Sequence, residues 1–438
     1  MELNKIELTK ETIELAYQNF KNRLPIFSKI YDYYCGNTDA LKNYVSTDRS
    51  NLKVSCNYIK KFIKEEVSYS VGNDITYASK TGNSKELEVI DSILENFKED
   101  HDVTLAKWLL TFGVAYEIYF INSFGDFNSK VVMPNAGYAI QKEGETIAFL
   151  HQFIDPVDNE IYVDLYTSSE IRHLNKDLEP IRDSTPHYFG EVPVGVCRIS
   201  EEEYLDTIYN DLKGLQDSLE TNLSDVTNEI SDFRNAYLLI TGVTIDEEVL
   251  KECKKRGCFE NPSADGKIEW LIKNINDSFI QNTINTIRNE MYQLVSHINN
   301  NEGMSSNNSG VALRARIMNM EARCKTNQRA LTECLKTRIR IMFIYASITG
   351  KGNFNWKDIK YKFTPSIPQD DVQVANIIRG LDGIISKETA LAQLSFIENP
   401  LQEIEKLKAE EEEAKEIYDN NFVFGTPGKK TTAPVVEE

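Results

Sequence analysis

Two long amphipathic stripes constrain the fold of this chain more than any other feature of its sequence. In the first, apolar residues recur every three or four positions from Ile208 to Phe233. This spacing is typical of a helix that buries one face, and Ser200, followed by three glutamates, has the form of a capping box that starts the helix at residue 203. A helix over 203–235 would be about 48 Å long, so it needs a long helical partner.

The second stripe supplies that partner within the same chain. Its apolar residues run from Ile280 to Ile298, and Asp277 lies where a helix cap is expected. We therefore predict two long helices, 203–235 and 275–298, packed side by side. The alternative is a two-stranded coiled coil that pairs the first helix of two chains.

Residues 236–274, between the two helices, predict a small αβ unit. Strands are expected over 236–240 and 267–272, with a helix over 245–255 between them. The end of that helix is basic, and it either docks a partner or is simply solvated. The candidate docking residues are Lys251, Lys254, Lys255 and Arg256.

The first 202 residues predict an α+β domain. Helical periodicity covers residues 9–34, 51–69, 86–97 and 103–112. Pro25 should break the first of these helices. After Gly113 the pattern alternates, and we expect one antiparallel meander. Its predicted strands are 114–120, 130–133, 146–150 and 160–166, and a separate short strand is predicted at 75–77.

A polar, uncharged loop, 299–310, leads into a long basic helix. Apolar residues at helical spacing extend from Leu313 to Met342. Between 311 and 348 there are eight basic and two acidic residues, a local charge of +6 in a chain whose net charge is −19. The loop could be an ordinary connector, or its amide and hydroxyl groups could touch phosphates without the salt-dependent affinity of lysines. The helix could face DNA, a neighbouring subunit or solvent.

The candidate residues of these two segments can be named individually. Those of the loop are Asn300, Asn301, Met304, Ser305, Ser306, Asn307, Asn308 and Ser309. Those of the helix are Arg314, Arg316, Arg323, Lys325 and Arg329.

The C-terminal part predicts a strand at 359–363 and a small helical region. Helices are expected over 370–381, from Ser386 onward and over 401–417. Residues 420–438 are expected to be disordered.

Composition excludes several classes of function. The acidic balance disfavours nonspecific adhesion to nucleic acid, so any DNA contact should be local. Seven scattered cysteines without a CxxC pair predict reduced, mostly buried thiols, and five isolated histidines give no metal motif. No apolar run is long enough for a membrane span, and the N-terminus lacks a secretion signal, so a cytoplasmic protein is expected. Neither a phosphate-binding glycine loop nor a catalytic acid pair occurs; we expect no cofactor, no metal and no enzyme activity.

Several strings, in this order and spacing, resemble the portal proteins of tailed bacteriophages, in particular the siphophage-like portal family. They are Tyr33-Tyr34-Cys35-Gly36, Asn57-Tyr58-Ile59-Lys60, the run from Tyr69 to Tyr77, Gly113-Val114-Ala115-Tyr116-Glu117, Phe233-Arg234-Asn235-Ala236-Tyr237-Leu238 and Ser309-Gly310-Val311-Ala312-Leu313.

The resemblance implies an α+β, mainly helical portal-type fold. In it, residues 1–202 would be the wing, 203–235 and 275–298 the stem, 236–274 the clip and 299–310 the tunnel loop. Residues 311–369 would be the long helix and the return to the wing, 370–419 a short crown and 420–438 a tail.

The resemblance also implies a function and partners. The chain would form a ring, usually of twelve subunits, at the capsid vertex, through which a terminase motor packages double-stranded DNA that is later ejected. Head-completion or adaptor proteins, the major capsid protein and scaffold protein would be its other partners, with no membrane involved. It would lie in the virion, and in the host cytoplasm during assembly. The rival hypotheses are a coiled-coil scaffold or adaptor without a channel, and a hydrolase within the meander.

Overall fold

The computed structural model describes residues 8–45, 50–233, 237–241, 246–248, 251–252, 267–271, 277–299, 310–365, 371–381, 383–391, 394, 403–404 and 406–410. Side chains are described for most of these, though not for 310–316. The chain divides into two compact units, Met1–Ser366 and Ile367–Glu438. Helices and strands are mixed, with helices predominating, as expected.

The first helix, α1 (Lys10–Cys35), runs unbroken through Pro25, so the expected break is wrong. Its two halves are held by different cores. Residues such as Phe20 pack with the five-stranded sheet, and Phe27 and Ile30 pack in the main core. This burial offsets the hydrogen bond that proline removes. Gly36 ends the helix with φ of 88°, as predicted.

The predicted second helix begins seven residues later than expected, as α3 (Tyr58–Val71), after the short α2 (Asp39–Asn43). Residues 50–57, which we call the strap, are extended instead. The N–H groups of Leu52, Val54 and Cys56 donate to side chains of α6 (Ile208–Phe233), at 2.7, 3.0 and 3.0 Å. The acceptors, one helical turn apart, are Asn228, Ser224 and Glu220.

The strap pairs with a helix because the two repeats match. Two extended residues advance about 6.6 Å and four helical residues about 6 Å, so alternate strap N–H groups meet successive turns. The side chains of Glu220, Ser224 and Asn228 are buried, and the strap satisfies them.

Helices α4 (Ser84–Leu94) and α5 (His101–Phe112) confirm the next two predictions. Gly113 follows α5 with φ of 78°, and a Cβ there would lie 2.2 Å from the carbonyl oxygen of Glu203, so only glycine fits.

The single predicted meander is wrong, because the strands form two sheets. Strands β4 to β8 follow one another in a five-stranded antiparallel sheet, but β2 and β3 pair in a separate three-stranded sheet that β9 completes. Six successive residues of β2 from Val114 are buried, so β2 is covered on both faces. The strands are β2 (Val114–Ile121), β3 (Phe127–Val132), β4 (Gly137–Lys142), β5 (Glu145–Ile154), β6 (Ile161–Tyr166), β7 (Glu170–Asn175), β8 (Thr185–Pro186) and β9 (Val194–Arg198).

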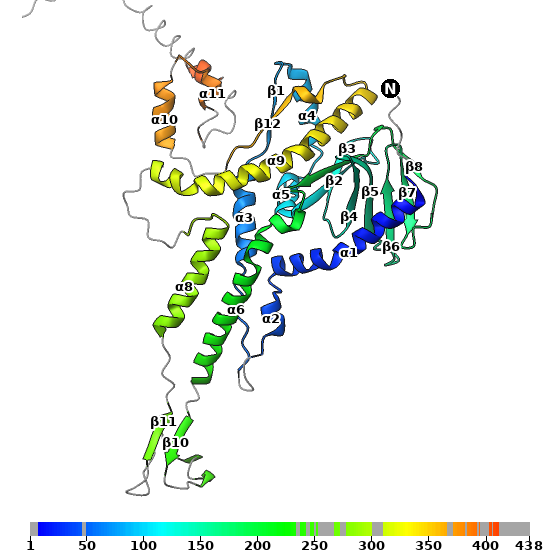
Figure 1. Ribbon diagram of the computed structural model, residues 1–438. Coiled ribbons are helices and arrows are strands. Elements are labelled where there is room, and N and C mark those ends of the chain that lie inside the picture. Colours follow the sequence, from blue (N-terminus) through cyan, green and yellow to red (C-terminus); the bar gives the residue numbers. More distant parts are fainter. Residues whose placement is uncertain are drawn as a thin grey trace, which may run out of the picture. The chain divides into compact units, whose positions relative to one another are not determined.

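The two long helices lie side by side in the same chain, as predicted (Figure 1). They are α6 (Ile208–Phe233) and α8 (Asp277–Leu294). The expected start at 203 is wrong, because Glu203–Asp206 form the 3₁₀ helix η1. Instead of capping a helix, the Glu203 carboxylate is buried and pairs with Arg23 and Arg198.

The predicted strands of the αβ unit are confirmed as β10 (Tyr237–Thr241) and β11 (Lys267–Leu271), which pair antiparallel. Of the helix predicted at 245–255, residues 247–248 and 251–252 are described and are helical.

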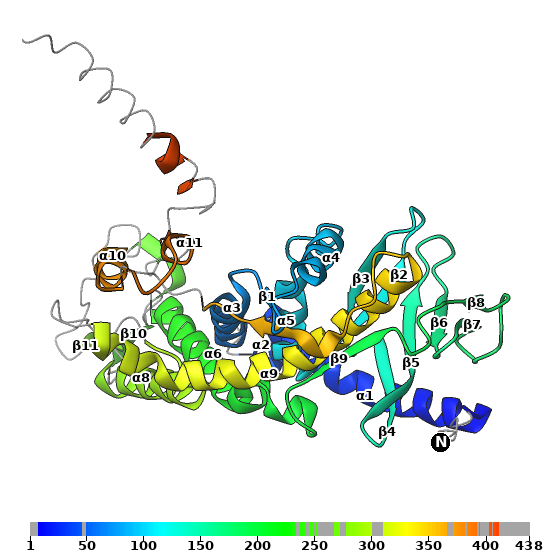
Figure 2. The ribbon, with the colours of Figure 1, turned by 90° about the horizontal axis from the view of Figure 1, so that it is seen from above.

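The long basic helix is confirmed as α9 (Gly310–Ile348). Figure 2 shows it running from the neighbourhood of α8 to the three-stranded sheet, where it packs on β9. After η2 (Trp356–Asp358), strand β12 (Ile359–Lys362) pairs with β1 (Thr76–Ser79).

The second unit contains α10 (Asp371–Gly380) and α11 (Lys387–Leu391), close to their predicted positions. Residues 403–404 and 406–410 are helical, within the helix predicted at 401–417. The tail predicted to be disordered lies outside the described residues.

Candidate functional site

The end of α8 is closed by a backbone turn that normally requires glycine. Ser296 has φ of 59°, its N–H donates to the carbonyl of Gln293 at 3.1 Å, and the N–H of His297 donates to that of Tyr292 at 3.0 Å. This is the Schellman pattern. A left-handed conformation costs a non-glycine residue about 1 kcal/mol, which must be offset elsewhere. The turn directs His297 toward α3.

Both nitrogens of His297 meet carboxylates of α3. Nδ1 lies 2.8 Å from Oε2 of Glu65, and Nε2 lies 3.3 Å from Oε1 of Glu66. The imidazole also lies against Phe62, with 4.6 Å between ring centroids. Burial alone would lower the pKa of His297, but the hydrogen bonds and charges of the two glutamates outweigh burial and raise it above its ordinary value.

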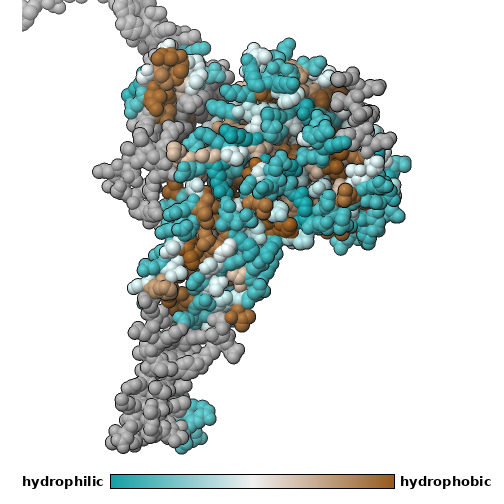
Figure 3. Space-filling view, in the orientation of Figure 1, coloured by the Kyte–Doolittle hydropathy of each residue, from teal (hydrophilic) through white to brown (hydrophobic). Residues whose placement is uncertain are grey.

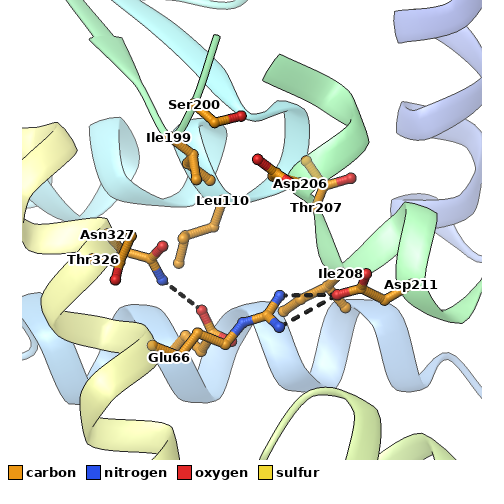
Figure 4. Close-up of a pocket in the computed structure, with 11 residues that line it drawn as sticks. Glu66, Leu110, Ile199, Ser200, Asp206, Thr207, Ile208, Asp211, Thr326 and Asn327 are labelled. Atoms are coloured by element: carbon orange, nitrogen blue, oxygen red, sulfur yellow. Dashed lines mark hydrogen bonds and ion pairs between the residues drawn. The ribbon is translucent and has the colours of Figure 1, made fainter. Parts of the chain in front are cut away.

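The same Glu66 carboxylate binds α9 from the other side. It accepts from Nδ2 of Asn327 at 2.7 Å and pairs with Nε of Arg323 at 2.8 Å. The terminal nitrogens of Arg323 continue to Asp211 of α6, at 3.3 Å each. Figure 4 shows Glu66, Asn327 and Asp211 converging on a pocket of about 320 Å³. We call Glu65, Glu66, Asp211, His297, Arg323 and Asn327 the junction cluster.

The junction cluster joins four helices, α3, α6, the end of α8 and α9. Glu66 is fully buried. A buried carboxylate is costly unless cations and hydrogen-bond donors surround it, and here three side chains do so. The cluster therefore ties both His297, which follows α8, and the part of α9 around Arg323 and Asn327 to α3.

A second buried cluster holds the far half of α9. The Arg338 guanidinium is inaccessible to solvent; its Nε donates to Glu117 of β2 at 2.9 Å and its terminal nitrogen to Asp102 of α5 at 2.6 Å. Nε2 of His101 lies 2.8 Å from the same Glu117 carboxylate. Burial alone would raise the pKa of Glu117, but Arg338 and His101 hold it well below its usual range.

The chain is similar to phage portal proteins over most of its length. The family described as "Phage portal protein, SPP1 Gp6-like" matches residues 14–416. The chain belongs to this family. This confirms the resemblance inferred from strings such as Tyr33-Tyr34-Cys35-Gly36.

One relative and two solved structures are similar to this portal-family chain. The portal protein of Bacillus phage SPP1 is 22% identical over 406 residues, which cover 86% of this chain and 79% of that protein. The neck of an empty gene transfer agent particle superposes with a TM-score of 0.44 at 9% identity, over 79% of this chain and 87% of that one. A chain from the virion of a native gene transfer agent particle superposes with a TM-score of 0.43 at 10% identity, over 77% of this chain and 88% of that one.

The structure places the candidate residues of the basic helix in different surroundings. Arg323 belongs to the junction cluster, whereas Lys325 pairs with Glu321 at 2.9 Å. Arg329 is exposed, and within the described part of the chain no acid pairs with it. The side chains of Arg314 and Arg316 lie outside the described residues.

Most other candidate residues fall outside the described ranges. All of the loop candidates lie there: Asn300, Asn301, Met304, Ser305, Ser306, Asn307, Asn308 and Ser309. So do Lys254, Lys255 and Arg256, the candidate docking residues between the two long helices. Lys251 is exposed and pairs with Glu247 one turn away, at 3.0 Å.

Sequence reasoning missed the buried residues that hold α9. His297 was one isolated histidine among five, and Glu66 follows another acid on an ordinary amphipathic helix. The two residues are 231 positions apart. The only local signal is a histidine directly before a polar loop, which is too weak to indicate its partners.

Other expectations can be compared with the described residues alone. Among these, no group of three or more histidine, cysteine or acidic side chains is arranged to hold a metal, and no helix has the length and apolarity to cross a membrane. The described cysteines are free thiols, as expected; Cys197, Cys324 and Cys334 are buried, Cys56 is partly buried and Cys35 is exposed.

Proposed function

We propose that the chain forms a ring-shaped channel at the capsid vertex, through which a terminase motor packages double-stranded DNA that is later ejected. Membership of the portal family over residues 14–416 carries this proposal. Head-completion and tail proteins would attach to the same ring. The protein would then belong to the virion and assemble in the host cytoplasm.

The attachment of the segment 300–309 supports a channel role for it. The residue before it, Asn299, closely follows His297, and the helix after it carries Arg323 and Asn327. All three side chains bind Glu66, so the chain is held shortly before this polar segment and again along the helix that follows it. A segment that contacts moving DNA needs such an anchorage if it is to resist force.

The apolar surface of the stem supports assembly with neighbouring copies. Phe279, Ile230 and Leu294 are 68%, 59% and 51% exposed in the single chain. Figure 3 shows hydrophobic residues gathered along the surface formed by α6 and α8. Exposed apolar patches mark interaction sites, and a heterologous contact between copies forms a ring when the rotation between neighbours closes.

The domain assignments follow from this proposal. Residues 1–202 would form the wing, α6 and α8 the stem, 236–274 the clip, 299–310 the tunnel loop, 311–369 the long helix and wing return, and 370–419 the crown.

Deletion of residues 301–309 tests the channel role. We expect rings of normal appearance in negative-stain images but a large loss of DNA packaged by the terminase in vitro. Replacement of the same residues by a glycine-serine linker of equal length is the matched control, since it keeps the connection between α8 and α9. Normal packaging by the deletion variant would remove the role assigned to this segment.

The scaffold or adaptor alternative predicts a different assembly. Because α8 of the same chain already covers α6 at Leu219 and Ile284, a coiled coil between two copies of α6 is not needed. Native mass spectrometry should detect a closed ring. A stable monomer or dimer at all salt concentrations would favour the alternative.

A further inference from the structure

We propose that His297 is a protonation-dependent lock. As an imidazolium, its side chain holds the end of α8 on α3, and it releases that end when the imidazole loses a proton. This inference rests on the proposed function, because it concerns the anchorage of the segment 300–309. It assigns a regulatory role to His297, which would act on the position of the backbone before that segment rather than through contact with DNA.

The geometry at His297 requires two donors. Nδ1 and Nε2 each lie within hydrogen-bond distance of a carboxylate oxygen, at 2.8 and 3.3 Å. A carboxylate oxygen only accepts, so both nitrogens must carry a proton. A neutral imidazole would turn a lone pair toward Glu65 or Glu66, which exchanges one charge-assisted hydrogen bond for repulsion.

The charged groups facing His297 come from three helices. They are Glu65, Glu66, Lys61 and Lys64 on α3, Arg323 on α9 and, through Arg323, Asp211 on α6. Lys61 pairs with Glu65 at 2.7 Å, and Arg323 pairs with Glu66 and Asp211. Of these groups, the two carboxylates contact the imidazole directly, and their negative charge favours its protonated form.

The other titratable groups around the lock keep their charge near neutral pH. Burial would lower the pKa of Lys61, but its bond with Glu65 raises it. Burial and the charge of Glu66 raise the pKa of Cys324 to about 12, so this thiol stays neutral. The pKa of Glu65, which burial would raise, is lowered by His297 and Lys61. A change between pH 6 and 8.5 therefore comes from His297.

The lock acts on a turn whose backbone conformation is unfavourable for a residue other than glycine. Ser296 holds a left-handed conformation next to His297. Without the second carboxylate bond, the interaction that offsets this conformation is weakened, and the turn can open. Opening would release the end of α8 from α3, while Arg323 and Asn327 still hold α9 on Glu66.

Amide hydrogen exchange of the assembled wild-type protein tests the lock. Peptides covering residues 291–299 should exchange about tenfold faster at pH 8.5 than at pH 6, after correction for intrinsic rates. His297→Gln should exchange fast at both pH values. Glu65→Gln removes one carboxylate and should move the pH dependence to lower pH, which a purely structural role for Glu65 does not predict.

His173→Gln is the matched control. His173 is also buried and bound to a carboxylate, Asp164 at 2.6 Å, but it lies on β7 in the five-stranded sheet. The His173→Gln variant should leave amide hydrogen exchange at residues 291–299 unchanged. Equal corrected exchange of the wild type at both pH values, or an unaltered profile in Glu65→Gln, would overturn the lock.

The two proposals fail separately. A pH-dependent turn in a protein whose 301–309 deletion packages DNA normally would refute the channel role and keep the lock. A pH-independent turn in a protein that needs 301–309 for packaging would refute the lock and keep the channel role.

Discussion

At the scale of single residues, this chain stabilises its long helix with buried charges rather than with apolar contacts alone. Glu66 and Glu117 each hold a separate part of α9, and both are inaccessible to solvent. Buried ion pairs add little net stability over apolar substitutes, but loss of one partner is costly. Here these ion pairs fix the position of α9 along its axis, because a carboxylate with two or three fixed donors is satisfied at only one position of the helix.

Glu117→Gln should destabilise the protein by about 3 kcal/mol, because Arg338 would keep its charge in the core without a full partner. The shift of the urea midpoint measures this change. The control is Glu191→Gln, which weakens the pair with Arg340, at 2.7 Å and partly exposed. This variant should lose less than about 1 kcal/mol. Equal losses in the two variants would contradict the role of burial.

The pH dependence of the same variant has a definite sign. The folded pKa of Glu117 is lowered, so its contribution is present above the ordinary glutamate value of about 4.3 and is lost as pH falls through the lower folded value. The difference in stability between wild type and Glu117→Gln should therefore be constant near neutral pH and shrink in acid.

At the scale of elements, α6 has two functional faces. One is the apolar stripe that packs on α8, and the other is the row of buried polar side chains that binds the strap. Asn228 both accepts from the N–H of Leu52 at 2.7 Å and donates to its carbonyl at 2.8 Å. The strap thus forms hydrogen bonds with a helix much as it would with a neighbouring strand.

Asn228→Leu should cost about 3 kcal/mol, because it leaves the N–H and C=O of Leu52 without their partner. Hydrogen exchange at residues 50–57 should become faster in this variant. Asn222→Leu is the control, because Asn222 bonds to the carbonyl of Ser218 in its own helix, at 2.7 Å. If Asn222→Leu freed the strap equally, the polar row would not be what holds it.

Elements with a strong period could be predicted, and those held by distant polar groups could not. The stripes around Leu212 and Ile284 identified α6, α8 and their pairing, because apolar burial follows local spacing. The strap was interpreted as helix because Val54 and Cys56 continue an apolar pattern, whereas their acceptors lie about 160 to 170 residues later. The junction cluster has the same property, since Glu66 meets partners from two other segments only after folding.

At the scale of the whole molecule, the division at residue 366 separates two units with their own contacts. A chain ending at Ser366 should keep the main thermal transition, with Tm changed by less than about 4 °C. Circular dichroism during heating measures this. A chain ending at Gly350 is the comparison: it also lacks β12, which pairs with β1, and it should melt much earlier. Similar melting of the two truncated chains would contradict the importance of this pair.

The pairing of β1 with β12 makes the N-terminal domain discontinuous. Thr76 faces Lys362, so two edges of one domain are synthesised at opposite ends of a long excursion that includes α6 and α8. A ribosome must deliver that whole excursion before the domain can close. Contacts of such wide sequence separation form slowly and leave strand edges open meanwhile. The last residues of the first unit therefore decide when a newly made subunit is ready to meet its neighbours.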